Sequence, residues 1–355
     1  MIRVLVVDDS AFMRKALATM LTGDPEIEVV GNARNGEEAL ELVRQLDPDV
    51  VTMDVDMPVM DGITAVRRIM AEAPRPILMV SSLTREGAEE TLAAMEAGAV
   101  DFIPKALSRV SLEIVHIEAE LRAKVKAVTR RRALKVSAAP RHPAPAPSIG
   151  PKGVELIAIG VSTGGPPAVQ RILAALPAQF PAPILIAQHM PRAFTGPFAQ
   201  RLDATSALTV REAEDGMPLA PGLVLVGPGG LHLRVRRQGL RLHAEVGQEP
   251  QDALYKPSAT ELIASVARTC AGRAAALIMT GMGSDGLEGA RRLKAAGGVV
   301  LAQSEATCTV YGMPKAVVDA GLADAVLDLD AIAETLVRLT DRSSSSFQPV
   351  RSVHG

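Results

Sequence analysis

Short apolar runs that alternate with helix-like stretches constrain the fold more than any other feature of this chain. The run Val4–Val7 shows no polar alternation, which is typical of a strand buried on both faces of a parallel sheet. A helical pattern follows it over residues 11–21, and the same order recurs along the chain. Such alternation predicts doubly wound α/β sheets. In the first part of the chain, we expect strands at residues 4–7, 27–30, 50–53, 77–80 and 99–103.

A proline-rich segment over residues 138–153 interrupts this series. Because such a segment buries little apolar surface and favours extended backbone, it predicts a spacer. With 355 residues, the chain is long enough for a core on each side of the spacer. We therefore expect two α/β domains, the first flavodoxin-like and the second Rossmann-like, mostly parallel and with an antiparallel hairpin. The predicted boundaries are a first domain over 1–125, a Pro/Arg-rich linker over 126–153, a second domain over 154–340 and a flexible tail over 341–355.

Polar side chains stand where the strands of the first domain end. Asp8 and Asp9 follow the first strand, Asp54 the third, Ser81 the fourth and Lys105 the fifth. Because parallel strands end at a shared edge of the sheet, these groups are expected to meet. The carboxylates would repel one another without a cation, and their hard oxygen ligands suit Mg²⁺. One carboxylate could then attack a phosphoryl group, with the lysine and Mg²⁺ balancing the developing charge.

Together with Met57-Pro58-Val59-Met60-Asp61-Gly62, these positions resemble a response-regulator receiver domain. The resemblance implies a histidine kinase as the phosphodonor. One departure is that Pro104 precedes the lysine, whereas the family commonly has proline after it, so the local loop shape is in question. The roles implied are Asp54 as the phospho-acceptor, Asp8, Asp9, Asp54 and the Asp56 carbonyl as Mg²⁺ ligands, Ser81 as the switch hydroxyl and Lys105 as the phosphate-sensing lysine.

The second domain carries a serine on a tight turn. Gly160-Val161-Ser162-Thr163-Gly164 matches the G-x-S-x-G pattern and lies between an apolar run at 154–159 and a helical stretch at 166–175. A serine hydroxyl needs an imidazole to take its proton and an acid to orient that imidazole. His189 and Asp285 each follow a predicted parallel strand and should share one crevice with Ser162.

The other histidines are less suitable as the base. His232 and His243 fall in predicted hairpin strands, where alternation could point them to solvent; the remainder lie in the first domain, the linker or the tail. The hairpin strands are expected at residues 223–226, 231–235 and 240–244, all antiparallel.

Two other protein classes share parts of these motifs. The order Ser, His, Asp differs from the Ser, acid, His order of α/β-hydrolases, so the turn pattern does not imply that fold. Residues 281–286 fit G-x-G-x-x-G, with Glu305 at a suitable distance for a ribose contact. However, Asp285 would place a carboxylate beside the pyrophosphate, and the motif comes late in its domain. This disfavours dinucleotide binding.

Four motifs together resemble the catalytic domain of chemotaxis protein-glutamate methylesterases: residues 160–165, 188–191, 281–286 and 311–314. The resemblance implies hydrolysis of glutamate γ-methyl esters, and deamidation of glutamines, on chemotaxis receptors. Phosphorylation would relieve occlusion by the first domain, and the esterase site would need no cofactor. Thr260 replaces an acid that the family often has, which leaves substrate-side or helix-capping contacts in question. The roles implied are Ser162 as the nucleophile, His189 as general base and acid, Asp285 as its orienting acid, the Met282 backbone N–H as an oxyanion donor and Thr163 as support for His189.

Composition limits the other functions. Aromatic residues make up 2% of the chain, tryptophan is absent and the net charge is −2, so stacking on nucleic acid is not expected. A DNA-binding output would also need a helix-turn-helix-like segment and a basic face, which the sequence lacks. We find no signal peptide or membrane-length apolar run, and expect a cytoplasmic protein with reduced Cys270 and Cys308. The alternative is a regulator outside chemotaxis whose second domain acts by partner binding.

Overall fold

The strands of the first domain form one parallel sheet in the order β2-β1-β3-β4-β5. The computed structural model describes residues 1–105, 117–129 and 152–341. Strands β3 and β4 are buried along their whole length, as their uninterrupted apolar runs predict. The strands are β1 (Ile2–Val7), β2 (Ile27–Ala33), β3 (Val50–Asp54), β4 (Ile77–Ser81) and β5 (Asp101–Pro104).

Each helix of this domain begins at a residue whose side-chain oxygen accepts a backbone N–H of the first turn. The capping residues are Ser10, Asn35, Asp61 and Thr84. The helices are α1 (Ala11–Thr22), α2 (Gly36–Leu46), α3 (Gly62–Glu72) and α4 (Arg85–Glu96).

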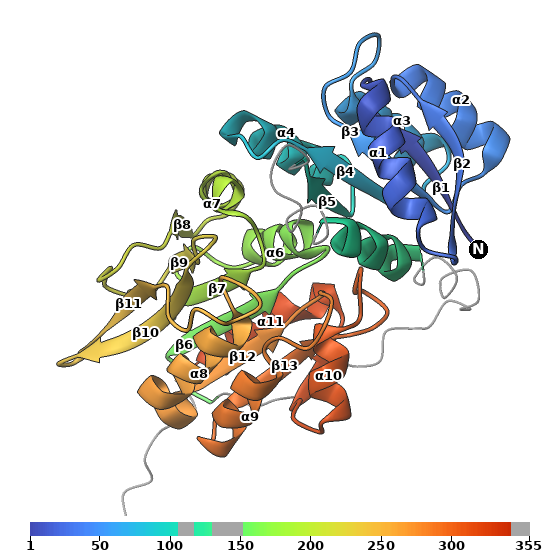
Figure 1. The fold of residues 1–355 in the computed structure, drawn as a ribbon. Helices are drawn as coiled ribbons and strands as arrows, with labels where there is room; N and C mark the ends of the chain where they lie inside the picture. Colours follow the sequence, from blue (N-terminus) through green and yellow to red (C-terminus); the bar gives the residue numbers. More distant parts are fainter. Residues whose placement is uncertain (106–116, 130–151, 342–355) are drawn as a thin grey trace, which may run out of the picture.

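A further helical segment, residues 117–129, is named here the connecting helix. It lies between the two domains, drawn in green in Figure 1. Leu121 and Val125 on this helix are fully buried in a cluster with Leu17 and Leu21 of α1. The sequence also predicts a helix over residues 107–128, of which residues 117–128 are observed as helix and residues 107–116 lie outside the described residues.

The second domain has a seven-stranded parallel sheet in the order β14-β13-β12-β6-β7-β9-β8. Helices cover both of its faces (Figure 1), so the expected fold class of two α/β domains is confirmed. The strands are β6 (Leu156–Val161), β7 (Ile184–Gln188), β8 (Thr209–Glu212), β9 (Leu223–Val226), β12 (Ala274–Ile278), β13 (Val299–Gln303) and β14 (Ala325–Leu327). The helices are α6 (Gly165–Ala174), α7 (Arg192–Thr205), α8 (Ala259–Cys270), the 3₁₀ turn η1 (Ala271–Arg273), α9 (Leu287–Ala295), α10 (Met313–Asp319) and α11 (Leu329–Thr340).

The antiparallel insert is smaller than expected. Strands β10 (His232–Gln238) and β11 (Arg241–Gly247) form the hairpin, but β9 pairs in parallel with β7 and β8 in the main sheet. The expectation that residues 223–226 form a hairpin strand is therefore wrong. The continuous apolar run of β9 is the pattern of a buried parallel strand, and its closeness in sequence to the hairpin misled the interpretation.

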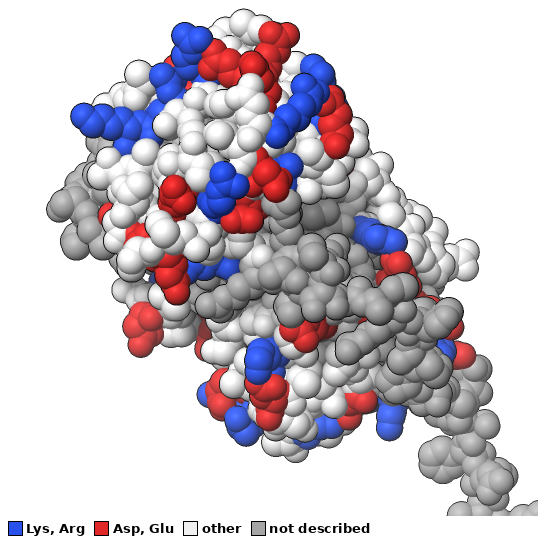
Figure 2. All heavy atoms as spheres, turned by 90° about the vertical axis from the view of Figure 1, so that its right-hand side faces the viewer, with Lys and Arg blue, Asp and Glu red and all other residues white. Residues whose placement is uncertain are grey.

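On the face shown in Figure 2, acidic and basic side chains are interspersed over the described part of both domains. Within residues 1–105, 117–129 and 152–341, no helix combines the length and the hydropathy that a bilayer crossing requires.

Candidate active site and phospho-acceptor site

Ser162 stands on the turn that joins β6 to α6. Its N–H donates to the carbonyl of Thr280 at 2.9 Å, and its own carbonyl accepts the N–H of Gly165 at 2.8 Å. Gly164 at the end of the turn has φ +76°, a conformation that glycine adopts without strain. A Cβ at Gly281 would lie 2.8 Å from the Cβ of Ser162. Two glycines thus permit the tight turn and the close approach of the Gly281 loop.

His189 follows β7, and its imidazole is held from two sides. Its Nε2 lies 2.8 Å from Oδ2 of Asp285, and both side chains are more than nine-tenths buried. The ring of Tyr255 stacks on the imidazole, with centroids 4.1 Å apart and planes inclined by 10°. The buried Nδ1 has no hydrogen-bond partner among the described residues. This nitrogen is the one left available for a proton from another group.

The carboxylate of Asp285 also lies at the N-terminus of α8. It accepts the hydroxyl of Ser258 at 3.0 Å and the backbone N–H groups of Ala259 at 2.7 Å and Thr260 at 2.9 Å. Burial alone would raise the pKa of Asp285, but His189 and the Thr260 hydrogen bond hold that pKa well below its usual range. The side chain therefore remains a carboxylate and both caps a helix and orients the imidazole.

Thr260 stands where the methylesterases that this chain resembles often have an acid, so its substrate-side or helix-capping contacts were in question. Its hydroxyl accepts the N–H of Gly286 at 2.8 Å, while its own N–H donates to Asp285. A threonine thus supports the loop that follows β12. The helix-capping contacts are intact because Asp285 itself provides them.

The supporting hydrogen bonds around Ser162 come from residues that sequence reasoning did not single out. Gln188 donates from Nε2 to the carbonyls of Ser162 at 3.1 Å and His189 at 3.2 Å. The hydroxyl of Thr280 donates to the carbonyl of Thr163 at 2.8 Å. The position of Gln188 directly before His189 was a sequence signal for its supporting role, whereas no local sequence pattern indicates such a role for Thr280.

The two support residues expected from the resemblance lie beside the serine. Thr163 is buried, and within the described chain it makes no hydrogen bond to His189, whose Nδ1 is unpaired. Met282 lines the same cavity as Ser162. The backbone N–H groups of Gly312 and Met313 donate to the carbonyl of Gly281, so the 311–314 motif holds the loop that carries Met282. The oxyanion role of Met282 stays a prediction.

Ser162, His189 and Tyr255 line a cavity of about 510 Å³. Its opposite wall consists of residues from β5 and the connecting helix, among them Phe102 and Lys124. The first domain therefore covers the serine site. This arrangement restricts the access of a large substrate.

Further contacts fix that cover in place. The ring of Phe102 stacks on the ring of Phe194 in α7 with centroids 4.3 Å apart. Glu96 at the end of α4 forms an ion pair with Arg201 of α7 and accepts the Gln170 side-chain amide at 2.9 Å. Aromatic stacking and charge pairing thus both contribute to domain docking.

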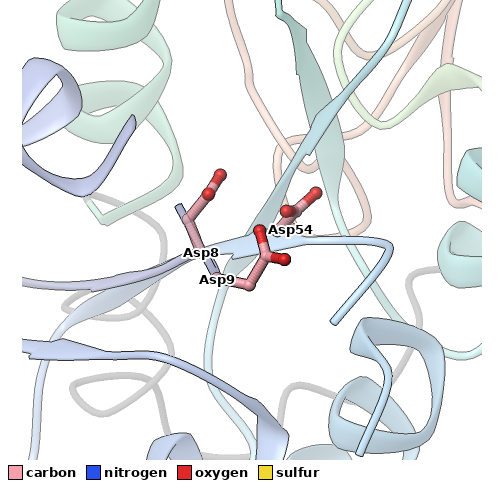
Figure 3. A group of neighbouring side chains, drawn as sticks. All are labelled: Asp8, Asp9 and Asp54. Atoms are coloured by element: carbon pink, nitrogen blue, oxygen red, sulfur yellow. The ribbon is translucent and has the colours of Figure 1, made fainter. Parts of the chain in front are cut away.

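The acidic cluster of the first domain lies at the carboxyl ends of β1 and β3 (Figure 3). Side-chain oxygens of Asp8, Asp9 and Asp54 lie within 4.8 Å of one another. Nζ of Lys105 lies 2.6 Å from Asp54 and 3.0 Å from Asp8. Burial raises the pKa of Asp54 to about 6, although the lysine opposes the shift. Lys105 supplies one positive charge beside three clustered carboxylates. Such hard oxygen ligands fit a divalent cation such as Mg²⁺.

The remaining expected switch residues lie close by. The hydroxyl of Ser81 donates to the carbonyl of Gly87 at 3.0 Å, and is therefore directed at α4. Pro104 continues β5 in register with Ser81, and the N–H of Lys105 donates to the Ser81 carbonyl at 2.7 Å. The unusual proline position thus leaves the lysine over the carboxylates. Asp56 is exposed just after β3, and its carbonyl as a ligand stays a prediction.

Comparison with known proteins gives matches to both domains. Residues 4–115 match the family described as response regulator receiver domain, and residues 157–336 match the family described as CheB methylesterase. A protein-glutamate methylesterase/protein-glutamine glutaminase 1 of Oleidesulfovibrio alaskensis is 58% identical over 364 residues, covering 95% of this chain and 99% of that protein. A protein-glutamate methylesterase/protein-glutamine glutaminase of Geobacillus kaustophilus is 46% identical over 343 residues, with 95% and 98% covered.

A solved structure resembles the second domain. It is the crystal structure of the Thermotoga maritima CheB methylesterase catalytic domain, which is 41% identical and superposes with a TM-score of 0.51. The match covers 52% of this chain and 97% of that structure.

Proposed function

The chain belongs to the CheB family of protein-glutamate methylesterase/protein-glutamine glutaminases, and we propose how its own side chains perform and control that reaction. The family activity is hydrolysis of glutamate γ-methyl esters and of glutamine side-chain amides in chemotaxis adaptation. The observation that carries our assignment is the buried His189–Asp285 pair, because His189 lines the same cavity as Ser162 and the receiver domain covers that cavity.

Ser162 acts as the nucleophile. Its Oγ attacks the γ-carbonyl carbon while Nδ1 of His189, the nitrogen not paired with Asp285, accepts the hydroxyl proton. The C–O bond to the methoxy group then breaks, and His189 returns the proton to the leaving methanol. Water attacks the acyl-enzyme through the same imidazole, which regenerates Ser162 and releases a glutamate carboxylate. For glutamine the leaving group is ammonia.

The surroundings of the imidazole suit these proton transfers. Asp285 is already ionised and hydrogen-bonded to Nε2, so it stabilises the positive charge that His189 acquires. Tyr255 covers one face of the ring and keeps water from it. Burial, together with the charge of Asp285, raises the pKa of the Tyr255 phenol, which stays protonated through neutral pH. The Met282 N–H is assigned to the developing oxyanion.

Asp54 accepts a phosphoryl group from a chemotaxis histidine kinase. Asp8, Asp9, Asp54 and the Asp56 carbonyl would hold Mg²⁺, which when bound supplies positive charge beside the phosphoryl oxygens. Lys105 then pairs with the phosphoryl group instead of the bare carboxylates, and Ser81 exchanges its bond to Gly87 for one to the phosphoryl oxygen.

These changes act on the surface that covers the esterase site. Lys105 directly follows β5, whose Phe102 stacks on Phe194 of the catalytic domain. Movement of the lysine therefore alters the docking of β5 and opens the cavity to receptor helices. The methylated segments of chemotaxis receptors are the substrates in this proposal.

The test is methanol release from methylated receptor membranes, with and without a small-molecule phosphodonor and Mg²⁺. We expect the phosphodonor to accelerate the wild-type enzyme, Asp54→Asn to abolish that acceleration and Ser162→Ala to abolish turnover. Ser206→Ala, a serine at the end of α7, is the matched control and should retain both responses. Turnover by Ser162→Ala would refute the nucleophile, and equal rates with and without phosphodonor would refute the switch.

A further inference from the structure

His232, the first residue of β10, is fully buried. The sequence left this histidine as a hairpin residue that could face solvent, and that expectation is wrong. Its neighbour across the hairpin is Gly247. The imidazole lies beneath the segment over residues 248–258 and contacts Pro250 and Ser258 in it.

Both ring nitrogens of His232 are used. Nε2 lies 3.1 Å from the carbonyl of Pro250, which can only accept, so Nε2 carries the proton. Nδ1 accepts the backbone N–H of Ser258 at 3.3 Å and therefore carries none. The geometry assigns one neutral tautomer. Burial lowers the pKa of His232, although the bond to Pro250 opposes the shift, so the neutral form is favoured.

The segment that His232 holds carries groups that touch the catalytic pair. Tyr255 stacks on the imidazole of His189. Ser258 donates its hydroxyl to the carboxylate of Asp285 at 3.0 Å, while its N–H donates to His232. A continuous chain of contacts therefore runs from His232 through Ser258 to Asp285 and His189. Its three hydrogen bonds, taken in that order, measure 3.3, 3.0 and 2.8 Å.

We propose that His232 is a positioning residue for the esterase reaction, which fixes the 248–258 segment and through Ser258 sets the orientation of Asp285 against His189. It touches neither substrate nor reacting atoms in this role. Removal of its contacts would let Ser258 move from Asp285 and Tyr255 tilt from the imidazole. Misplacement of a catalytic group by about 1 Å can lower a rate about a hundredfold. The inference rests on the proposed roles of His189 and Asp285.

Two conservative variants separate the contacts of His232. His232→Asn keeps an acceptor near the position of Nδ1 and can retain the N–H of Ser258. His232→Gln keeps a donor near the position of Nε2 and can retain the carbonyl of Pro250. Because Ser258 is the residue bonded to Asp285, we expect the Asn variant to hold kcat within about threefold of wild type. The Gln variant should lose about tenfold to a hundredfold in kcat with KM nearly unchanged.

The measurements use the full-length protein with phosphodonor, and record methanol release, labelling of Ser162 by a fluorophosphonate and thermal unfolding. His243→Gln, in the facing strand of the same hairpin, is the matched control and should leave kcat unchanged. Histidine side-chain NMR should show His232 as the Nε2–H tautomer. Equal kcat for the Asn and Gln variants, a loss confined to KM, or the other tautomer would overturn the inference. If wild-type Ser162 is neither labelled nor required for turnover, the proposed function fails instead.

Discussion

The ring of Phe102 in the receiver domain stacks on the ring of Phe194 in the methylesterase domain, with centroids 4.3 Å apart and planes inclined by 11°. Lys124 of the connecting helix lies over the Phe102 ring at 5.4 Å and donates to the Phe102 carbonyl at 2.7 Å. The connecting helix thus holds Phe102 in place, and the Phe102 ring contacts the methylesterase domain. It joins the end of β5 to the wall of the active-site cavity.

Phe102→Ala should therefore raise the methylesterase rate in the absence of phosphodonor. A stacked pair contributes roughly 0.5–1.5 kcal/mol beyond its buried area, so the ratio of covered to open enzyme should fall about twofold to tenfold. The measurement is methanol release by unphosphorylated enzyme. Phe12→Ala, which removes an exposed ring of α1, is the control and should leave this rate unchanged. An unchanged rate for Phe102→Ala would show that the stack does not hold the domains together.

Reversal of the charge at Glu96 should have a similar effect that depends on salt. Glu96→Arg would face Arg201 and replace attraction by repulsion between α4 and α7. We expect basal turnover to rise about twofold to fivefold at low ionic strength, and the effect to shrink at high salt because the pair is partly exposed.

The double variant Glu96→Arg/Arg201→Glu restores opposite charges and should return the basal rate toward that of wild type. Reversal of the pair between Arg44 and Glu72, which lies wholly within the receiver domain, is the control. If the double variant kept a raised basal rate, the ion pair between Glu96 and Arg201 would not act directly in holding the two domains together.

Asp54→Asn should stabilise the receiver domain in the absence of divalent cations, and more at pH 8 than at pH 4. Burial raises the pKa of Asp54 from 3.8 to about 6, so the folded protein holds this proton more tightly than the unfolded chain does. The contribution of Asp54 to wild-type stability is therefore largest below pH 3.8 and falls as pH rises through about 6. Asp54→Asn lacks this loss of stability. At pH 8 its free energy of unfolding should exceed that of wild type by on the order of 1 kcal/mol.

Thermal unfolding of both proteins across this pH range measures the effect, and added Mg²⁺ should reduce it by neutralising the wild-type carboxylates. Glu41→Gln on the exposed face of α2 is the control. A difference that is independent of pH would mean that the charge of Asp54 is not the cause.

Asp285→Asn should lower both turnover and stability. The amide of the variant would point an N–H group either at the backbone N–H groups that begin α8 or at Nε2 of His189. The wild-type carboxylate accepts hydrogen bonds at both places. We expect kcat to fall by at least about a hundredfold and the free energy of unfolding by about 1 kcal/mol or more. Because the folded pKa of Asp285 is depressed, the wild-type stabilisation is present above about 3.8 and lost as pH falls below it.

The stability difference between wild type and Asp285→Asn should thus narrow in strong acid. Asp252→Asn, an exposed carboxylate near the same helix, serves as the control for kcat and unfolding. Unimpaired turnover in Asp285→Asn would remove this residue from the mechanism.

Local sequence patterns were enough to predict the two parallel sheets and the edges at which their polar groups gather. Uninterrupted apolar runs followed by Asp8, Asp54 or Ser162 are local patterns, and parallel strands necessarily end together at one edge. Their places after predicted strands also grouped Ser162, His189 and Asp285, and the resemblance to known motifs added the catalytic role of each. The sequence did not separate β9 from the hairpin strands, because a short apolar run carries no signal of its partner.

The contacts between segments that are distant in the chain became known from the folded structure alone. It placed Asp285 at the start of α8, buried His232 beneath the 248–258 segment, stacked Tyr255 on His189 and set Phe102 against Phe194. None of these contacts follows from periodicity, because each depends on the side-chain packing of segments that are remote in the chain. The same packing places the receiver domain over the active-site cavity, so the control of Ser162 that we propose depends on the folded protein and not on its local sequence.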